Sequence, residues 1–441
     1  MNRFLPKILQ YFARALVILV LSIPVILLLL PIQTSSSIAP GESLTPTEIA
    51  RAEQLILDMA PQSPRLPSMQ EITINISEIN ILTRYLLELT NFSTDWDIRF
   101  SQRENLINAS SSWQLVSGWI PLYLNLRGEF KIQNNKFSLE GIQAGGLYLP
   151  KRLGNLFLET VQNNLTRPNT VFTEITKIIT NIRSINVEET EISAQVIWDP
   201  VLVGTISDKA QQFLISPEDR ERIVNYYLSI NEIITVIPTD TRAISLNALL
   251  NPLFESARKK SEQNENPIAE NRTLFQTLAI YVNNENIENL VGEDLAKDLP
   301  NPKFIEVRLL RRQDLAQHLI SMAAITASIG SDLAQLVSTT KEAYDARYRS
   351  GFSFSDLTAN NVGVAMGSIA TESIASAIEM QHRLANVQSE SDYMPLIGNN
   401  RDGLTEPDFT SIYNDRSSLE YQKRLTEIQE MIKSRPLFQD L

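Results

Sequence analysis

A change in the spacing of apolar residues near residue 200 constrains the fold of this chain more than any other feature. Before that point, apolar and polar residues alternate in runs typical of half-buried strands, and beyond it their spacing is that of amphipathic helices. The sequence therefore predicts an α+β fold: an antiparallel β-meander domain with helices over residues 70–200, then a mainly α-helical domain over residues 201–391. A C-terminal helical tail is expected over residues 392–441.

Local signals place individual elements within these domains. Period-two runs predict four consecutive strands, over Asp95–Ser101, Asn105–Val116, Ile120–Gln133 and Lys136–Ile142. Ser216, followed by Pro217 and by Asp219 three residues on, is typical of a helix start, because the serine accepts from a free N–H and proline suits the first helical position. Thr405 and Ser417–Ser418 predict two further starts in the tail.

The N-terminal sequence predicts a membrane anchor. Arg3, Lys7 and Arg14 precede an uncharged run from Ala15 to Ile32, whose 18 residues would extend about 27 Å as a helix. We expect a cytoplasmic basic segment (residues 1–14), a transmembrane helix (residues 15–32) and a linker (residues 33–69). The positive-inside rule then predicts a single-pass protein of the bacterial inner membrane with most of the chain in the periplasm. A cleaved signal peptide is the alternative, because small residues follow the run.

Composition excludes several classes of function. The chain has 39 basic and 51 acidic residues and a net charge of −12, which disfavours nucleic acid as a partner. It has no cysteine, so disulfides, iron–sulfur clusters and cysteine nucleophiles are excluded. Its two histidines, His318 and His382, exclude multi-histidine metal centres. The sequence also lacks a nucleophile elbow, a phosphate-binding loop and a dinucleotide fingerprint.

Polar residues at helical spacing between residues 314 and 367 form the candidate site. Asp314 and His318 are four residues apart, so on a helix the carboxylate can orient the imidazole. Glu342 and Asp345 are three apart and share a face. Two carboxylates that close raise one another's proton affinity, which is a common way to produce a general acid beside an ionised partner.

The third helix of this region is expected to carry a stripe of Asp356, Asn360, Gly363 and Gly367, at offsets of 0, 4, 7 and 11. The glycines let another backbone approach closely, so this stripe should face inward. Ser355 or Asp356 is expected to begin the helix.

The order of these residues is similar to that of the YfiM family of predicted periplasmic lipoproteins and, more distantly, to VanZ-like membrane proteins. The resemblance covers residues 314–367. It implies that the polar positions of the family correspond to His318, Glu342, Asp345 and Asp356, with Asn360 and Gly363 at the helix step. It implies no settled reaction, and Leu319–Val337 is too polar to span a membrane as the VanZ-like helices do.

A second resemblance covers residues 70–200. The order of strands, hairpin and a Gly-Leu-Tyr-Leu-Pro step (residues 146–150) before a helix resembles the extracytoplasmic domain of the YpmS family. This resemblance implies a curved sheet able to contact an apolar ligand, and no chemistry.

Three interpretations of the polar cluster are open. The first is a buried hydrogen-bonded network that holds three helices together. The second is a catalytic or metal site with His318 as general base or ligand, in which a divalent cation would be held by His318, Glu342, Asp345 and Asp356. The third is a ligand surface with apolar contacts from Phe352 and Phe354 and polar contacts from Asp314, Lys341 and Asn360.

These observations lead to one functional hypothesis and one alternative. The hypothesis is a membrane-anchored periplasmic protein of envelope maintenance that binds lipid or cell-wall material such as peptidoglycan. The alternative is a hydrolase with a His/carboxylate site that uses a divalent metal. Burial discriminates them, because an enzyme needs its residues to open into a cleft.

Overall fold

The structure of the chain is a computed structural model. It describes residues 31–38, 44–61, 63, 66–89, 96–103, 106–133, 136–165, 181–188, 191–202, 215–348, 350–397, 400–416 and 418–440. These residues divide into two compact units. The described residues of unit 1 lie within Met1–Ala52, Met69–Arg167 and Ile178–Trp198, and those of unit 2 within Glu53–Ser68 and Asp199–Leu441.

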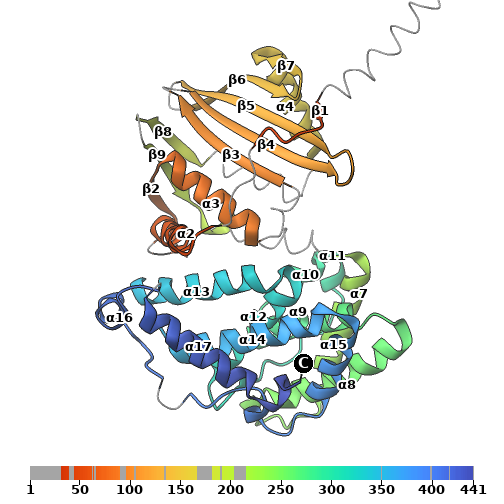
Figure 1. Cartoon of the computed structure of the whole chain (residues 1–441). Helices are drawn as coiled ribbons and strands as arrows, with labels where there is room; N and C mark the ends of the chain where they lie inside the picture. Colours follow the sequence, from red (N-terminus) through yellow and green to blue (C-terminus); the bar gives the residue numbers. More distant parts are fainter. Residues whose placement is uncertain are drawn as a thin grey trace, which may run out of the picture. The chain divides into compact units, whose positions relative to one another are not determined.

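Unit 1 is built on an antiparallel meander (Figure 1). Its strands follow one another in the sheet as they do in the sequence, and a short strand, β1 (Ile32–Gln33), pairs with β5. The meander strands are β3 (Trp96–Arg103), β4 (Leu106–Val116), β5 (Leu122–Gln133), β6 (Lys136–Ala144) and β7 (Leu147–Pro150). The four strands predicted from period two are confirmed, with ends that shift by one or two residues.

A second sheet and the helices α2 (Pro46–Met59), α3 (Ile76–Leu89) and α4 (Lys151–Leu165) also belong to the described residues of the first part of the chain. The sheet has the order β2 (Ser68–Ile74), β9 (Ile192–Trp198), β8 (Ile182–Val187). Helix α3 packs on β3, and α4 packs on β6 and β7. Helix α2 contains the boundary between the two units. Ile107, Ile185 and Ile192 are buried together between elements of the two sheets.

Unit 2 is mainly helical, as the change of spacing predicts. Its longer helices are α7 (Pro217–Thr235), α8 (Asn247–Asn264), α9 (Pro267–Val282), α12 (Gln313–Ile329), α13 (Ser331–Tyr348), α14 (Phe354–Glu372), α15 (Ile374–Ala385), α16 (Glu406–Tyr413) and α17 (Leu419–Lys433). Shorter elements are α10 (Glu288–Val291), α11 (Glu293–Ala296), η2 (Glu390–Asp392) and η3 (Pro436–Phe438). The helix starts predicted at Ser216, Thr405 and Ser418 are confirmed, since each side chain accepts a hydrogen bond from the backbone N–H three residues on.

Two short strands in unit 2 have no counterpart in the predicted pattern. β10 (Ala243–Ser245) and β11 (Glu306–Arg308) pair in parallel, and β11 leads into the start of α12. Strands of three residues are too short to show a period of two. Val307 of β11 belongs to the large core of unit 2, to which α7, α8, α9, α12, α14, α15 and the tail also contribute.

Helices α12 and α14 approach each other through the predicted glycines. A Cβ atom on Gly363 would lie 2.2 Å from the carbonyl oxygen of Leu319, and one on Gly367 would lie 2.5 Å from that of Ala323. Only hydrogen atoms fit in this contact, so the predicted inward orientation of the stripe is confirmed. The contact fixes the spacing of the two helices that carry His318 and Asp356.

The structure corrects the prediction of a membrane-spanning helix. Within the part of the chain that the structure describes, no helix is both long and apolar enough to cross a membrane. Residues 1–30, where most of the predicted span falls, lie outside the described residues. At its end, Pro31 is in a turn and Ile32 belongs to β1, where it pairs with Leu124 instead of continuing a helix.

Candidate functional site

His318 lies at the centre of the polar cluster, on the face of α12 that meets α14. Its Nδ1 is 2.9 Å from Oδ1 of Asn360, and its Nε2 is 3.3 Å from Nζ of Lys341 and 3.5 Å from Oδ2 of Asp356. The amide oxygen accepts, so Nδ1 carries the proton and the Nε2 lone pair faces the lysine ammonium. The ring is therefore neutral in this arrangement.

Burial and charge support the neutral form of His318. Its side chain is 12% exposed, and burial together with the positive charge of Lys341 lowers its pKa, against the opposing charge of Asp356. Burial raises the pKa of Asp356, while the charge that His318 carries when protonated and the charge of Arg312 act in the opposite direction. Protonation of His318 at Nε2 would repel Lys341 and create a hydrogen bond to Asp356, so the ring has two alternative partners.

Lys341 connects the histidine to α13. Its Nζ donates to Oδ2 of Asp345 at 3.0 Å, one turn further along α13. Asp345 is thus the partner of a cation, where the sequence predicted a carboxylate pair with Glu342. The backbone of Glu342 lies in α13, and its side chain lies outside the described residues.

Arg312, just before α12, pairs with three carboxylates, two of which are distant in sequence. Its guanidinium pairs with Asp314 at 2.6 Å, with Asp356 at 3.1 Å and with Asp402 at 3.2 Å. The carboxylate of Asp314 therefore pairs with this arginine, whereas the sequence predicted that it would orient His318. The spacing along one helix does not reveal an arginine that lies outside that helix.

The start of α14 is built by a loop from the tail. Ser353 is the N-cap residue, since its hydroxyl accepts from the N–H of Asp356 at 3.0 Å. Asp402 accepts from the Ser353 hydroxyl and from the N–H of Ser355, both at 3.0 Å. The predicted start at Ser355 or Asp356 is late by one or two residues, since the helix begins at Phe354. The sequence does not show that Asp402 also accepts from this first turn.

The side chains of Phe352 and Phe354 are buried against other side chains of unit 2. Each is 1% exposed. The ring centroid of Phe352 lies 4.8 Å from that of Phe409, and the centroid of Phe354 lies 5.4 Å from that of Tyr413. The tail helices α16 and α17 thus cover the two phenylalanines that the sequence offered as ligand contacts.

The members of the polar cluster therefore pair with one another. Lys341 covers Nε2 of His318, and Arg312 pairs with Asp356. Among the described residues, no group of three or more His, Asp and Glu side chains is arranged to hold a metal ion. The divalent metal stays a prediction from the sequence. The geometry favours the first interpretation, a network that joins α12, α13, α14 and the loop at Asp402.

His318→Gln is expected to reduce the pH dependence of the stability of unit 2. A histidine whose pKa is lowered by folding stabilises the fold above its unfolded pKa of about 6.5, and this contribution is lost as the pH falls through the lower folded value. Wild-type protein should thus melt at a lower temperature at pH 5 than at pH 7.5, and the difference should shrink in the variant. Circular dichroism melts at the two pH values measure this. His382→Gln is the control, and an equal loss of the difference in both variants would contradict the prediction.

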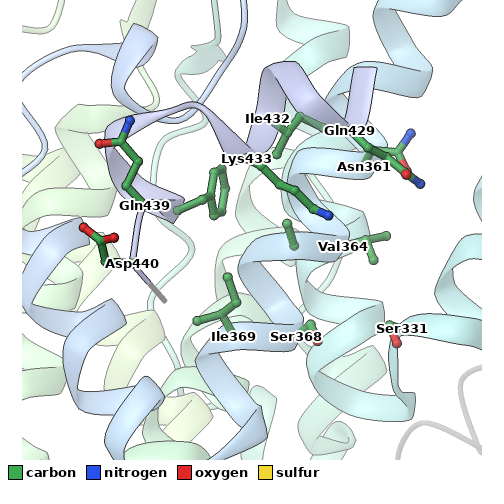
Figure 2. A pocket seen from close by; sticks show the side chains of 12 residues that line it. Ser331, Asn361, Val364, Ser368, Ile369, Gln429, Ile432, Lys433, Gln439 and Asp440 are labelled. Carbon is green, nitrogen blue, oxygen red and sulfur yellow. The ribbon is translucent and has the colours of Figure 1, made fainter. Parts of the chain in front are cut away.

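A cavity of about 740 Å³ lies on another part of α14 (Figure 2). Its walls are α14, the end of α17 and η3 with the two residues that follow, and Ser331 at the start of α13 also lines it. Sites for small molecules usually measure about 300–1,000 Å³. The sequence did not predict this cavity, because its lining residues come from stretches up to 109 positions apart.

The lining of the cavity is apolar in the middle and polar at the edge. Val364, Ala365 and Ile369 come from α14, and Ile432 and Phe438 come from the C-terminal segment. Lys433, exposed at the last residue of α17, reaches toward α14 in Figure 2. None of the described side chains forms an ion pair with Lys433. The cavity thus combines an apolar surface with one available cation.

A buried carboxylate elsewhere in unit 2 was also not predicted. Glu270 on α9 is 1% exposed and accepts hydrogen bonds from Arg222 at 3.2 Å, from Asn264 at 2.7 Å and from the hydroxyl of Tyr226. Asn266 and Pro267, a cap followed by a proline, mark the start of α9 in the sequence, but no sequence signal shows that its first turn is buried. With its partners satisfied, Glu270 is a structural group.

Comparison with known proteins gives no further assignment: no protein-family model matches the chain, and neither the curated proteins nor the solved structures contain a match. The resemblances to the YfiM, VanZ-like and YpmS families stay predictions. The function must therefore be argued from the geometry of this chain.

Proposed function

We propose that the protein is a lipid-binding protein of a bacterial envelope, and that the cavity beside α14 binds the apolar chain of a single-chain anionic amphiphile. The observation that carries the proposal is a cavity of about 740 Å³ that is lined in part by apolar side chains of α14 and the C-terminal segment and has an exposed lysine at its edge. The envelope location is an expectation from the N-terminal sequence and does not depend on the cavity.

The chemistry of the lining selects the ligand class. Val364, Ile369 and Phe438 offer aliphatic and aromatic surface, which favours burial of a hydrocarbon chain over a sugar or a peptide backbone. Lys433 would pair with a carboxylate or phosphate head, and its position at the edge leaves the head partly in water. Asp440 is the anion of the lining and disfavours a second negative group at its end of the cavity.

The hydrolase alternative has weaker support from the geometry. A general base needs a nitrogen or oxygen within reach of a substrate proton, and Nε2 of His318 faces the ammonium of Lys341. Asp356 pairs with His318 as the carboxylate that orients the histidine does in a catalytic dyad. Both residues, however, belong to the network of the polar cluster. We therefore assign the cluster to stability and the cavity to binding.

Palmitate is the first probe, because it is the simplest amphiphile of the proposed class. Calorimetric titration of the full chain should detect binding that Val364→Phe weakens roughly ten-fold or more, since the added ring occupies the cavity. Lys433→Met should weaken it by roughly three- to ten-fold through loss of the charged hydrogen bond.

Two matched controls test whether these effects are local. Ile374→Phe adds the same ring to an exposed position on α15, and Lys423→Met removes a lysine from an exposed position of α17. Both should bind palmitate as the wild type does. Unchanged affinity in Val364→Phe, or absence of palmitate binding by the wild type, would refute the cavity as the site. Ester turnover that is lost in His318→Gln would instead support the hydrolase alternative.

A further inference from the structure

The loop between β4 and β5 exposes an unusual amount of apolar surface. All six residues from Leu115 to Ile120 are exposed. Trp119 is 102% exposed, Ile120 is 64% exposed and Val116 is 47% exposed. Figure 1 shows that this loop joins two neighbouring strands of the meander at their ends. Single exposed apolar residues are ordinary, but a fully exposed tryptophan beside exposed isoleucine and valine marks an interaction site.

Further tryptophans lie on the strands at the same end of the sheet. Trp113, near the end of β4, pairs in register with Trp96 at the start of β3. Trp113 is 50% exposed and Trp96 is 41% exposed. Three of the four tryptophans of the chain are therefore exposed at this end.

The charge pattern of the loop is as distinctive as its apolar surface. No charged residue occurs between Glu104 and Arg127. The loop and the parts of β4 and β5 next to it therefore have no charged side chain. Removing a charged side chain from water costs free energy. Because the β4–β5 loop has no charged side chain, it can leave water without that cost. Tryptophan is also the residue most characteristic of the boundary between headgroups and acyl chains, because its large ring is apolar while its N–H can remain hydrogen-bonded.

The first described strand of the chain lies beside the residues that follow this loop. Residues 1–30 precede Pro31 and contain most of the longest uncharged apolar run in the sequence. The first described strand, β1, pairs with Tyr123 and Leu124, the second and third residues of β5 after the loop. The strand that follows this run in the sequence, β1, thus lies beside the residues of β5 that follow the exposed loop.

We propose that the β4–β5 loop is a membrane-contact site, which inserts Trp119 and Ile120 into the interfacial layer of a lipid bilayer. A bilayer fits better than a protein groove, since the tip combines tryptophan, aliphatic side chains and a lack of charge, whereas protein interfaces usually add a charged or hydrogen-bonding rim. This inference concerns unit 1 and is independent of the cavity in unit 2.

The test uses the full chain with phosphatidylcholine vesicles whose acyl chains are brominated, because bromine quenches tryptophan that reaches the acyl boundary. Wild-type fluorescence should be quenched, and Trp119→Phe should lose more than half of that quenching. Trp198→Phe, which removes an indole from β9, is the matched control and should be quenched as strongly as the wild type. Trp119 should also become less accessible to acrylamide in the water phase when vesicles are added.

A second pair of outcomes separates the bilayer from other partners. Equal quenching in the wild type and in Trp119→Phe, or unchanged access of acrylamide to Trp119, would overturn the proposal. Shielding of Trp119 that rises with protein concentration in the absence of vesicles would also overturn it, in favour of a second copy of the chain. Val364→Phe should retain the quenching and Trp119→Phe should retain palmitate binding, so the two proposals fail separately.

Discussion

Gly363→Ala in α14 is expected to lower the free energy of unfolding of unit 2 by about 2–3 kcal/mol. The new Cβ would lie 2.2 Å from the carbonyl oxygen of Leu319 and 3.0 Å from the backbone nitrogen of Ala323. Both atoms belong to the backbone of α12, which cannot rotate away as a side chain can. Alanine favours a helix by up to about 1 kcal/mol over glycine, and the clash outweighs that gain.

The positions of the tryptophans allow the loss of stability to be assigned to one unit. All four tryptophans (residues 96, 113, 119 and 198) belong to unit 1, so tryptophan fluorescence reports its unfolding while circular dichroism at 222 nm follows mainly the helices of unit 2. In urea, Gly363→Ala should shift the dichroism transition and leave the fluorescence transition in place. Ser368→Ala, on the same helix at the cavity, is the control. A dichroism midpoint equal to that of the wild type would show that α12 and α14 are not in close contact.

Glu270→Ala is expected to destabilise unit 2 by about 3–5 kcal/mol, the larger of the two effects. The substitution leaves Arg222, Asn264 and Tyr226 without the acceptor that they share. Burial and the negative charge of Glu270 raise the pKa of Tyr226, so the tyrosine is neutral at all ordinary pH values and its hydroxyl donates a hydrogen bond to the carboxylate. Removing one member of a buried network costs more than the network contributes as a whole.

The same dichroism experiment measures the effect of Glu270→Ala. Glu255→Ala is the matched control: it removes a glutamate from the ion pairs with Arg258 and Lys259 on the surface of α8, and its midpoint should stay near that of the wild type. If the two alanine variants unfold at the same urea concentration, the carboxylate of Glu270 is not buried in the network described.

Local sequence signals predicted local structure well. Alternation predicted the strands of the meander, and Ser216, Thr405 and Ser418 marked the starts of α7, α16 and α17, because a cap and its N–H are three residues apart. The glycine stripe predicted the contact of α12 and α14, since helical spacing places Gly363 and Gly367 on one face. In each case the cause lies within about one turn or one strand.

Partners distant in sequence account for most of the differences. Asp402 reaches the N–H of Ser355 from 47 residues away, and Arg312 pairs with Asp402 across 90 residues, so the part that Asp402 plays at the start of α14 was not visible in the spacing. His318 and Asp356, both members of the candidate site, lie close together, but the spacing assigned the orienting role to Asp314, which pairs with Arg312. The cavity depends on the packing of the C-terminal segment, which no local pattern specifies.

The order of strands in the meander has a consequence for the speed and sequence of folding. Each strand from β3 to β7 pairs with the next one along the chain, so each step closes only a short loop and loses little chain entropy. This sheet can therefore form during synthesis, before the helices of unit 2 have left the ribosome. β1 is the exception, because Ile32 pairs with Leu124, 92 residues later, and it can join only after β5 is in place. The residues of β1 can thus be fixed in the sheet only after those of β5, although they are made long before them.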